Sequence, residues 1–291
     1  MWYVLSDGSG NEKTYGFESE KREMFGEGNV TEYDNAAYKQ TSHEVSISPL
    51  FRWPNSVDHF TASEPTITLM PVTTDPGTIT IKDTFKNFVF GDESKSINVE
   101  ASGTKVVAGN GDNKVDVTGR LREITLGHGS NLITGNIRGI SVGNGNNIIK
   151  DTADFTKIKL GDGNNHVLIS GLKPTLEVGH GINNVEFKGR SGSLIFTKDI
   201  SPEQLWFQHK EQDLNISVIG SKQKVTLHNW YADLPERPRE IITGSNRWLM
   251  ERNVERLVEA MAAFAPPTSA TFNLSETEQQ RLQPVLAANW R

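Results

Sequence analysis

The chain has 291 residues, contains no cysteine and carries 30 basic and 36 acidic side chains, for a net charge of −6. The missing cysteines exclude a disulfide framework and thiolate chemistry, and no stretch approaches the run of about 18 apolar residues that suggests a membrane-spanning helix. The negative charge is mild and not clustered along the sequence, which argues against nucleic acid as a partner.

Residues 1–76 are polar, with scattered aromatic side chains and no helical period. This composition predicts irregular β structure, with strands at 44–47 and 66–72 and a turn at the Asp-Pro-Gly sequence of 75–77. We interpret the segment as a β-rich N-terminal cap or as part of an upstream domain. It shows no secretory signal. Asp7, Ser9 and Asn11 have the spacing of calcium-loop ligands, but Glu12 stands where such a loop needs glycine, so no site is assigned there.

A five-residue turn of the form Gly-x-Gly-x-Asn then recurs at steps of 18, 16, 18 and 18 residues. The copies are 109–113, 127–131, 143–147, 161–165 and 179–183. A short apolar run rich in β-branched residues follows each turn, and a second run comes half a period later, as expected for two strands per coil. A fixed period of this length predicts a parallel β-solenoid domain at 77–198 with about 18 residues per coil. We expect six coils, the first of them degenerate and starting at Gly91. The segments 78–82 and 87–90 are expected to lead into this first coil.

These turns resemble the nonapeptide G-G-x-G-x-D-x-U-x of the repeats-in-toxin, or haemolysin-type calcium-binding, family. The resemblance implies a parallel β-roll in which the Asp of the motif supplies carboxylate ligands to calcium between coils. The chain departs from the pattern in two ways. The opposite turns lack Gly-x-Gly, and asparagine occupies the Asp position in every copy: Asn113, Asn131, Asn147, Asn165 and Asn183.

The asparagines weaken the case for a metal, because calcium takes about six to eight oxygen ligands and its affinity depends on how many are charged. Stacked amides can instead hydrogen-bond to one another as a ladder. We therefore expect a structural Asn ladder and no metal or other cofactor, with calcium binding as the alternative. In that alternative, the calcium ligands would come from the turns at Gly109, Gly111, Asp112, Gly127, Gly143, Gly161, Asp162 and Gly179. Asp92 and Glu93 are interpreted as solvated acids.

Residues 199–291 are expected to form a small α+β capping and secretion module. The pattern predicts a helical turn within 199–207, started by Ser201 and Pro202, a hairpin of 213–219 with 224–231, and a strand and turn over 240–249. Two helices are predicted after these strands. The first covers 253–264 and stops at the prolines 266–267, and the second covers 276–289. The second helix has a capping box of Ser275 and Glu278, and Pro284 is expected to kink it or end it early.

Three motifs in this region are similar to the domain found beside haemolysin-type repeats: S-P-E-x-L-W-F, D-L-x-I-x-V-x-G and K-V-T-x-x-N-W. The final residues also resemble the C-termini of large bacterial secreted proteins of this kind. This resemblance implies that Arg291 is the natural end of a longer parent chain.

No catalytic motif is recognisable, and the chain is expected not to be an enzyme. His128 and His180 share a turn position but lie three coils apart, so both are interpreted as surface residues. His209 and His228 are interpreted as structural hydrogen-bonding groups. Five aromatic residues are expected in the core of the C-terminal module rather than in a sugar-binding platform: Trp206, Phe207, Trp230, Tyr231 and Trp248.

Three functions remain open. The first is a non-enzymatic C-terminal module of a secreted bacterial toxin or adhesin, serving export, capping and attachment to a host cell-surface receptor or glycan. The resemblance implies type I secretion to the extracellular medium and a role in virulence, and insecticidal toxins of the makes-caterpillars-floppy type are a candidate parent. The second is a calcium-dependent folding module. The third is a polysaccharide-acting solenoid enzyme. It is disfavoured because the outward strand residues are mixed in charge and form no acidic or basic cluster. These residues are Asp116, Thr125, Lys159, Glu177 and Glu186.

Overall fold

The computed structural model describes residues 2–6, 12–19, 28–33, 67–69, 77–232, 236–265 and 274–291, and these are mainly in β structure. The chain falls into two compact units, Met1–Thr73 and Thr74–Arg291. No helix within the described ranges is long and apolar enough to cross a membrane.

The first unit contains an antiparallel sheet in the order β1 (Trp2–Ser6), β2 (Glu12–Ser19) and β3 (Gly28–Tyr33). The sequence pattern did not single out these strands. A short strand, β4 (Ile67–Leu69), falls inside the range predicted at 66–72. The strand predicted at 44–47, the residues 75–76 and the segment 7–11 lie outside the described residues.

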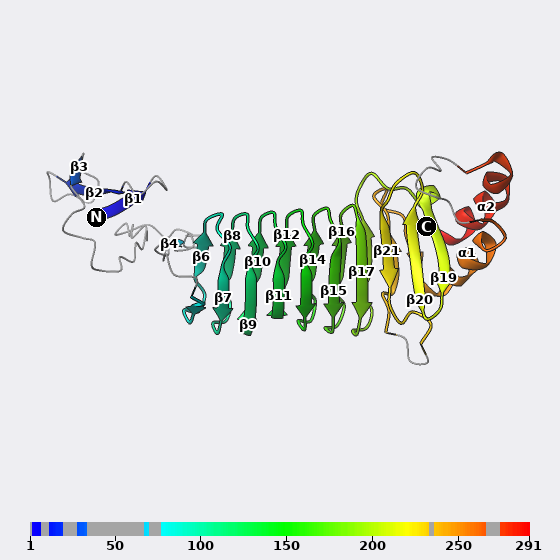
Figure 1. Cartoon of the computed structure of the whole chain (residues 1–291), viewed down its shortest axis with the longest axis horizontal. Helices are drawn as coiled ribbons and strands as arrows, with labels where there is room; N and C mark the ends of the chain where they lie inside the picture. Colours follow the sequence, from blue (N-terminus) through cyan, green and yellow to red (C-terminus); the bar gives the residue numbers. More distant parts are fainter. Residues whose placement is uncertain are drawn as a thin grey trace, which may run out of the picture. The chain divides into compact units, whose positions relative to one another are not determined.

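The second unit begins with a parallel β-solenoid, as predicted, and each coil gives one strand to each of two sheets (Figure 1). The first sheet contains β5 (Ile79–Ile81), β7 (Ser96–Val99), β9 (Lys114–Leu121), β11 (Leu132–Ile137), β13 (Ile148–Asp151), β15 (Asn165–Ile169) and β17 (Ile182–Phe187). The second sheet contains β6 (Asn87–Phe90), β8 (Lys105–Ala108), β10 (Glu123–Leu126), β12 (Gly139–Val142), β14 (Lys157–Leu160), β16 (Thr175–Val178) and β18 (Ser193–Phe196).

The solenoid has about seven coils, one more than predicted. The extra coil is β5 with β6, which the sequence pattern suggested only as a lead-in. Ile79 pairs in parallel with Ile97 and Phe88 pairs with Val106, so this segment is itself a coil. We number the coils 1 to 7, from β5–β6 to β17–β18.

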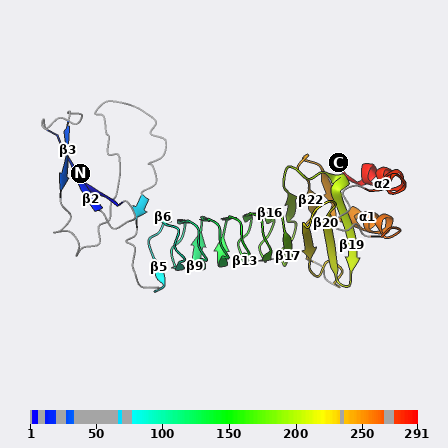
Figure 2. The same cartoon turned by 45° about the horizontal axis from the view of Figure 1, so that its top comes forward.

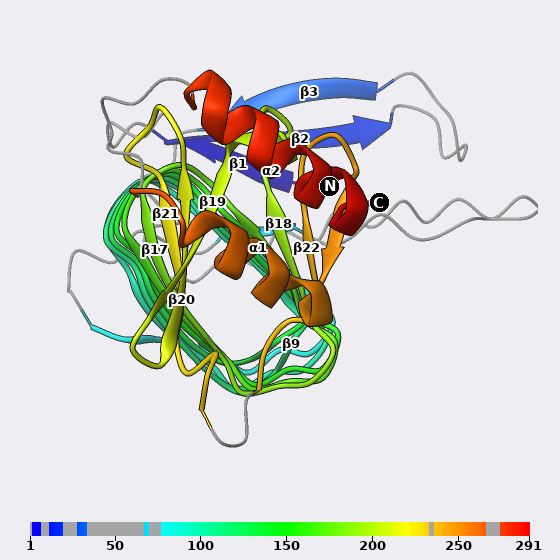
Figure 3. The ribbon, with the colours of Figure 1, turned by 90° about the vertical axis from the view of Figure 1, so that its right-hand side faces the viewer.

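The core consists of columns of apolar side chains, one from each coil, held in register by the parallel ladders. In the first sheet the column includes Val115, Ile133, Ile149, Val167 and Val185, all at most 1% exposed. Seen along the rod axis, the coils lie one behind another (Figure 3). Each coil therefore buries its apolar face against its neighbours, as expected for a solenoid.

Coil 3 and coil 4 differ in length because the repeat shortens to 16 residues at that point. In the ladder between β9 and β11, Gly135 faces Val117 but Ile137 faces Leu121. Two residues are thus missing on the side away from the Gly-x-Gly turns. The strands on both faces keep their register, so the shortened repeat does not interrupt the core.

The C-terminal module continues both sheets of the solenoid. Its strands are β19 (Leu205–Lys210), β20 (Asp213–Val218), β21 (Lys224–Leu227), β22 (Glu240–Ile242) and β23 (Trp248–Met250). β21 pairs in parallel with β17, and β22 pairs in parallel with β18. These two strands form a further layer on coil 7. β19 and β20 then extend the first sheet in antiparallel fashion, and β23 extends the second.

Helices close this end of the rod (Figure 2, Figure 3). They are the 3-10 turns η2 (Pro202–Gln204) and η3 (Glu251–Asn253) and the helices α1 (Val254–Met261) and α2 (Glu276–Asn289). The predicted turn after Ser201, the hairpin of β20 with β21, and both helices are confirmed.

Several details of the C-terminal prediction differ. The strand predicted at 224–231 ends at Leu227, and the helix predicted at 253–264 ends at Met261. Residues 205–207, which were predicted as part of the helical turn, begin strand β19. Pro284 lies inside α2 and does not end it, and the capping box of Ser275 with Glu278 starts the helix as expected. The proline pair 266–267 lies outside the described residues.

Candidate functional site: the glycine–asparagine edge

The most regular polar feature of the molecule is a column of five asparagines inside the Gly-x-Gly turns. Each Nδ2 donates to the Oδ1 of the next asparagine along the rod, at 3.0 Å from Asn113 and at 2.8 Å in the three later steps. All five side chains are at most 2% exposed. The predicted Asn ladder is therefore present at Asn113, Asn131, Asn147, Asn165 and Asn183. We call the edge formed by these turns, residues 91–95 through 179–183, the asparagine edge.

Asn147 shows why an amide suits this position. Its Nδ2 donates to Asn165 Oδ1 at 2.8 Å and to the carbonyl of Gly145 at 3.2 Å, which uses both of its hydrogens. Its Oδ1 accepts from the side chain and the backbone N–H of Asn131. An ionised Asp would accept the same two bonds but could donate neither of the others. The ladder thus depends on amide N–H donors, which the Asp of the calcium-binding motif lacks.

Different groups complete the ladder at its two ends. At the first end, the backbone N–H of Lys95 donates to Asn113 Oδ1 at 3.1 Å. At the last end, Asn183 Nδ2 turns to the carbonyl of Gly179, and the buried Gln223 donates to the same carbonyl at 3.2 Å. Gln223 lies just before β21, so the C-terminal module covers the end of the ladder.

A second ladder runs along the outside of the same turns, at the second turn position. Each side chain accepts the backbone N–H of the equivalent residue in the next coil. The series runs from Asp92 through Asn110, His128, Asn144 and Asp162 to the N–H of His180, with distances of 2.8–3.0 Å. The position needs an acceptor, which Asp, Asn and neutral His all supply. His128 and His180 are exposed turn residues, as predicted, and the bond that the His128 ring accepts from Asn144 N–H explains why histidine fits at position 128.

Side chains at the fourth turn position of some coils also accept a backbone N–H from the next coil. Asp112 Oδ1 accepts from Ser130 N–H at 2.7 Å, and Asn164 Oδ1 accepts from Ile182 N–H at 3.0 Å. Asp112 and Asp162, named above as possible calcium contributors, therefore accept bonds from the neighbouring coil. Asp92 does the same, while Glu93 pairs with Lys95 at 2.6 Å.

The two glycines of each turn are required for different reasons. At the first, Gly143, an added Cβ would lie 2.7 Å from the carbonyl carbon of Gly127 in the preceding coil. The second, Gly145, has φ 141°, a conformation that is closed to residues with a side chain. Its N–H donates to the carbonyl of Asp162 at 2.8 Å. The glycines thus allow the coils to approach closely enough for direct hydrogen bonds.

The oxygen atoms that this edge could offer as ligands fit calcium poorly. The interior oxygens are neutral amides that already accept hydrogen bonds, and turn carbonyls such as Gly111 O and Gly129 O accept from the asparagines. Among the described residues, no group of three or more His, Asp or Glu side chains is arranged to hold a metal ion. A hard cation would have to displace several hydrogen bonds at each coil before it could bind.

A charged cluster joins the asparagine edge to the C-terminal module. His180 contacts Asp162 through Nδ1 at 3.0 Å and Asp199 through Nε2 at 3.1 Å. Hydrogen bonds that the His180 ring donates to the carboxylates of Asp162 and Asp199 raise the pKa of His180 above its ordinary 6.5. The pKa of Asp162 is lowered mainly by the backbone N–H of His180, and that of Asp199 mainly by the nearby hydroxyl of Thr197. Sequence reasoning missed this cluster because Asp199 lies outside the repeats.

Asp151 is a buried carboxyl on the other side of the rod, beside the shortened coil. It is 1% exposed and accepts from Ile137 N–H at 2.9 Å and Ala153 N–H at 3.2 Å. Burial raises its pKa from 3.8 to about 6, against the opposing effect of these hydrogen bonds. Ile137 is the residue that follows the two-residue gap, so Asp151 satisfies backbone left unpaired by the missing residues.

The aromatic residues of the C-terminal module behave in two ways. Trp206, Phe207 and Trp230 are at most 2% exposed, which confirms their predicted place in the core. Tyr231 is half-buried and stacks on His209 with ring centroids 3.6 Å apart. Trp248 is 40% exposed, so its predicted core position is wrong, because it occupies an outward position of β23. His228 bonds to Asp213 at 2.9 Å and His209 to the carbonyl of Glu211, in line with structural roles.

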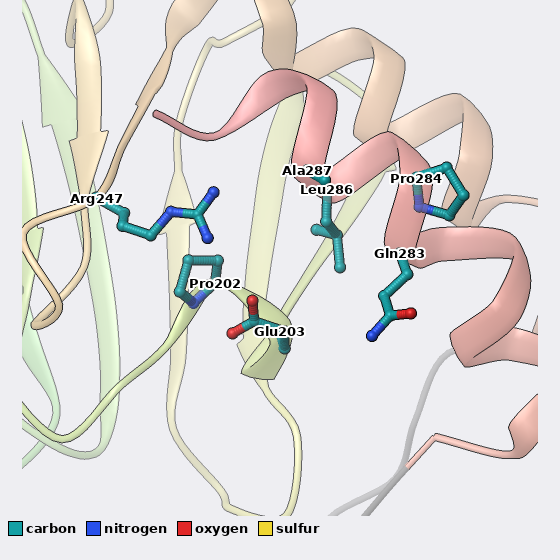
Figure 4. A pocket seen from close by; sticks show the side chains of 7 residues that line it. All are labelled: Pro202, Glu203, Arg247, Gln283, Pro284, Leu286 and Ala287. Carbon is teal, nitrogen blue, oxygen red and sulfur yellow. The ribbon is translucent and has the colours of Figure 1, made fainter.

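A shallow cavity of about 430 Å³ lies between η2 and α2 (Figure 4). It is lined by Pro202, Glu203, Arg247, Gln283, Pro284, Leu286 and Ala287. Arg247 donates to the carbonyl of Trp290 at 3.1 Å and so holds the last residues against β23. The arrangement ties the chain end to the cap. No protein-family model matches the chain.

Proposed function

We propose that this chain is a non-enzymatic, self-supporting solenoid module of a secreted bacterial repeats-in-toxin-like protein, a toxin or adhesin. Its roles are to form a rigid rod, to cap the end of that rod, to carry the export signal, and to attach the protein to a target cell. The observation that carries the proposal is the Asn ladder, in which four side-chain hydrogen bonds join five successive asparagines.

The ladder supports a structural role because it replaces charged ligands with neutral groups that are satisfied within the chain. Buried amides with all partners in place stabilise a single arrangement, whereas unpaired ones are costly. A module of this kind folds at any calcium concentration, including that of the cytoplasm. It then carries its rod shape with it to the outside.

The C-terminal module supports the capping role. A solenoid end exposes unpaired strand edges and the open core, which promote association with other chains. Here β21 and β22 complete a further layer, α1 buries Val254, Leu257, Val258 and Met261, and the C-terminal Arg291 exchanges two backbone hydrogen bonds with Trp248 of β23. The end of the second sheet is thereby covered.

Two experiments test the proposal. First, the export role is tested by fusing residues 199–291 to a reporter and co-expressing it with a type I exporter, and the reporter is expected in the medium. A fusion lacking α2 is the matched control and is expected to stay inside the cell. Second, fluorescently labelled protein is incubated with candidate host cells, and attachment is measured by flow cytometry. A reporter retained in both fusions, together with no attachment to any cell type, would overturn the proposal.

The calcium-dependent alternative makes the opposite prediction in a titration. A binding isotherm stronger than about 1 mM, the weak end for extracellular sites, would favour that alternative. The enzymatic alternative would be favoured by release of unsaturated uronate products from polysaccharides.

A further inference from the structure

The edge opposite the asparagines has a different composition, which is visible only when the coils are stacked. We call it the opposite edge; in coils 3 to 7 it consists of the loops 118–122, 134–138, 151–156, 170–174 and 188–192. These loops carry six basic residues, Arg120, Arg122, Arg138, Lys173, Lys188 and Arg190. They carry two acidic residues, of which Asp151 is buried and Asp154 is exposed.

The basic residues form two clusters along the rod. Arg122 and Arg138 occupy equivalent positions in adjacent coils, because Glu123 and Gly139, which follow them, lie next to each other in the second sheet through Ile124 and Ile140. With Arg120 they make a first cluster on coils 3 and 4. Lys173, Lys188 and Arg190 make a second cluster on coils 6 and 7, where Lys173 N–H donates to Arg190 O at 2.8 Å. All six side chains are exposed.

Most of these charges are not neutralised by other residues of the described part of the chain. Among the described residues, Arg120, Arg138, Lys173 and Arg190 have no ion-pair partner; Arg122 donates only to Asn87, and Lys188 lies 3.5 Å from Glu186. Like charges in register on neighbouring strands destabilise a sheet. The pair Arg122 and Arg138 of the first cluster therefore carries an electrostatic cost that a bound anion would relieve.

An exposed aromatic ring lies between the two clusters, on coil 5. Phe155 is 61% exposed and has φ 58°, a left-handed conformation that is unfavourable for a bulky side chain. Lys173 Nζ lies 6.0 Å from the ring centroid. At the equivalent position of coil 2 the chain has Gly103, with φ 70°. Neither burial nor backbone preference accounts for a phenylalanine here, so the ring is available for a ligand.

From this arrangement we propose that the opposite edge of coils 3 to 7 binds a linear acidic polysaccharide. Phe155 contacts the face of a sugar ring, and the two basic clusters bind sulfate or carboxylate groups on either side of it. The proposal deepens the attachment role above and rests on it, since it names the chemistry of the target-cell partner.

The composition of the edge favours a polysaccharide over an anionic lipid surface. Four of the six basic residues are arginines, whose planar fork matches discrete carboxylate and sulfate groups. The apolar contribution is small, since Phe155 and the 49% exposed Leu172 are the large apolar side chains exposed there among the described residues. Binding to a lipid surface draws on a broad apolar face buried in the headgroup region as well as on charge attraction. The opposite edge is instead one turn wide and runs along the rod.

The test measures binding of the full chain to immobilised heparin and chondroitin sulfate, with neutral dextran, phosphatidylserine vesicles and single-stranded DNA as comparison probes. The expected result is binding to the sulfated glycans that weakens steeply with salt, and weaker or no binding to the other three. Equal binding to neutral dextran, or stronger binding to vesicles or DNA than to both glycans, would overturn the proposal.

Three variants locate the site. R122E/R138E is expected to weaken glycan binding by about tenfold or more, since each change turns an attraction into a repulsion. The matched control K114E/K150E makes the same change in net charge on the outward face of the first sheet, where both lysines are exposed, and is expected to keep most of the affinity. F155G fits the left-handed backbone, so it preserves the fold, and it is expected to weaken binding by about two- to tenfold through loss of the ring. An equal loss of glycan affinity in K114E/K150E and R122E/R138E would mean that general charge attraction, and no specific site, binds the glycan, and it would overturn the proposal.

Asp154 provides a variant with the opposite sign. Its Oδ1 accepts from Leu172 N–H at 2.8 Å, a bond that an amide oxygen can also accept. D154N removes the one exposed negative charge between the clusters and is expected to tighten glycan binding severalfold; weaker binding would contradict the proposal. Cell attachment that survives enzymatic removal of acidic glycans would overturn this inference but leave the proposed function standing. Glycan binding in solution without cell attachment would support this inference and overturn the proposed attachment role.

Discussion

The two edges of the solenoid obey different rules, although both are made of turns between the same two sheets. On the asparagine edge the sequence repeats almost without change, and second-position side chains and buried amides bond to the next coil. On the opposite edge the loops differ in sequence and even in length, and six basic side chains and a phenylalanine face solvent.

The contrast teaches that sequence repetition follows packing constraint. Where two backbones approach closely, as at Gly127 and Gly143, the set of acceptable residues is small and the same motif recurs. The opposite edge keeps glycine where it approaches the preceding coil closely, as at Gly119, Gly171 and Gly189. Exposed positions such as Arg138 and Arg190 have no ion-pair partner among the described residues and are therefore free to carry binding groups.

The largest expected effect on the asparagine edge comes from Gly145→Ala. Gly145 has φ 141°, and an added Cβ would collide with the carbonyl of Gly129. We expect a loss of more than about 3 kcal/mol of unfolding free energy, measured by urea denaturation, because both the backbone and the inter-coil contact are disrupted. Gly91→Ala is the matched control: nothing lies within 4 Å of its added Cβ, and it should change stability by less than about 0.5 kcal/mol. Similar losses in both variants would show that close approach is not what selects the glycines.

The next effect concerns the ladder itself. Asn147→Ala leaves the buried donors of Asn131 and the oxygen of Asn165 without their partners, and we expect a loss of about 2–4 kcal/mol. Asn146→Ala removes an exposed amide that accepts one bond, from Asn164 N–H, and should cost less than about 1 kcal/mol. If the two alanine variants unfold at the same urea concentration, the buried column is no more important than the surface one.

On the opposite side, the pH dependence of stability tests the buried Asp151. Its pKa is raised in the folded state to about 6 from 3.8, so the folded chain binds a proton more tightly than the unfolded chain. Stability from this group is fully present below pH 3.8 and is lost as pH rises through about 6. The loss amounts to about 3 kcal/mol. D151N should remove this part of the pH dependence, seen as a flatter plot of unfolding free energy between about pH 4 and pH 7. An unchanged slope in D151N would mean that another group is responsible.

The smallest effect is expected at the junction cluster. Because the pKa of His180 is raised, its contribution is present below pH 6.5 and is lost as pH rises through the raised pKa. Because the pKa values of Asp162 and Asp199 are lowered, theirs is present above pH 3.8 and is lost as pH falls through the lowered values. The cluster is therefore most stabilising between these limits, by a few tenths of a kcal/mol since its side chains are about half exposed. His180→Asn should flatten the stability profile at mildly alkaline pH, and a larger loss there than in the parent chain would contradict this account.

The sequence predicted the solenoid and its ladder because both depend on short-range repetition. A five-residue motif at a step of 18 residues specifies which residues stack, and the Asn position within it specifies what they can bond. The predicted hairpin of β20 with β21 and the helices α1 and α2 likewise follow from local patterns and caps.

Features that depend on three-dimensional stacking were not accessible in the same way. The parallel pairing of β21 with β17 joins residues about two coils apart along the chain, and the register of Arg122 with Arg138 appears only after the 16-residue step is allowed for. Charge that is scattered along the sequence is therefore gathered on one edge in space. Asp151 and Gln223 were missed because each sits where the repeat is broken, and a broken repeat carries no periodic signal.

The central claim is that neutral hydrogen bonds, without bound cations, hold the coils together. The most direct measurement is the melting temperature of the full chain after exhaustive dialysis against a calcium chelator, compared with the same sample supplied with about 5 mM calcium, above the usual range for extracellular sites. Hydrogen-bonded amides predict the same melting temperature in both samples. A transition that moves upward by several degrees with calcium, or a chain already unfolded in chelator, would contradict the claim.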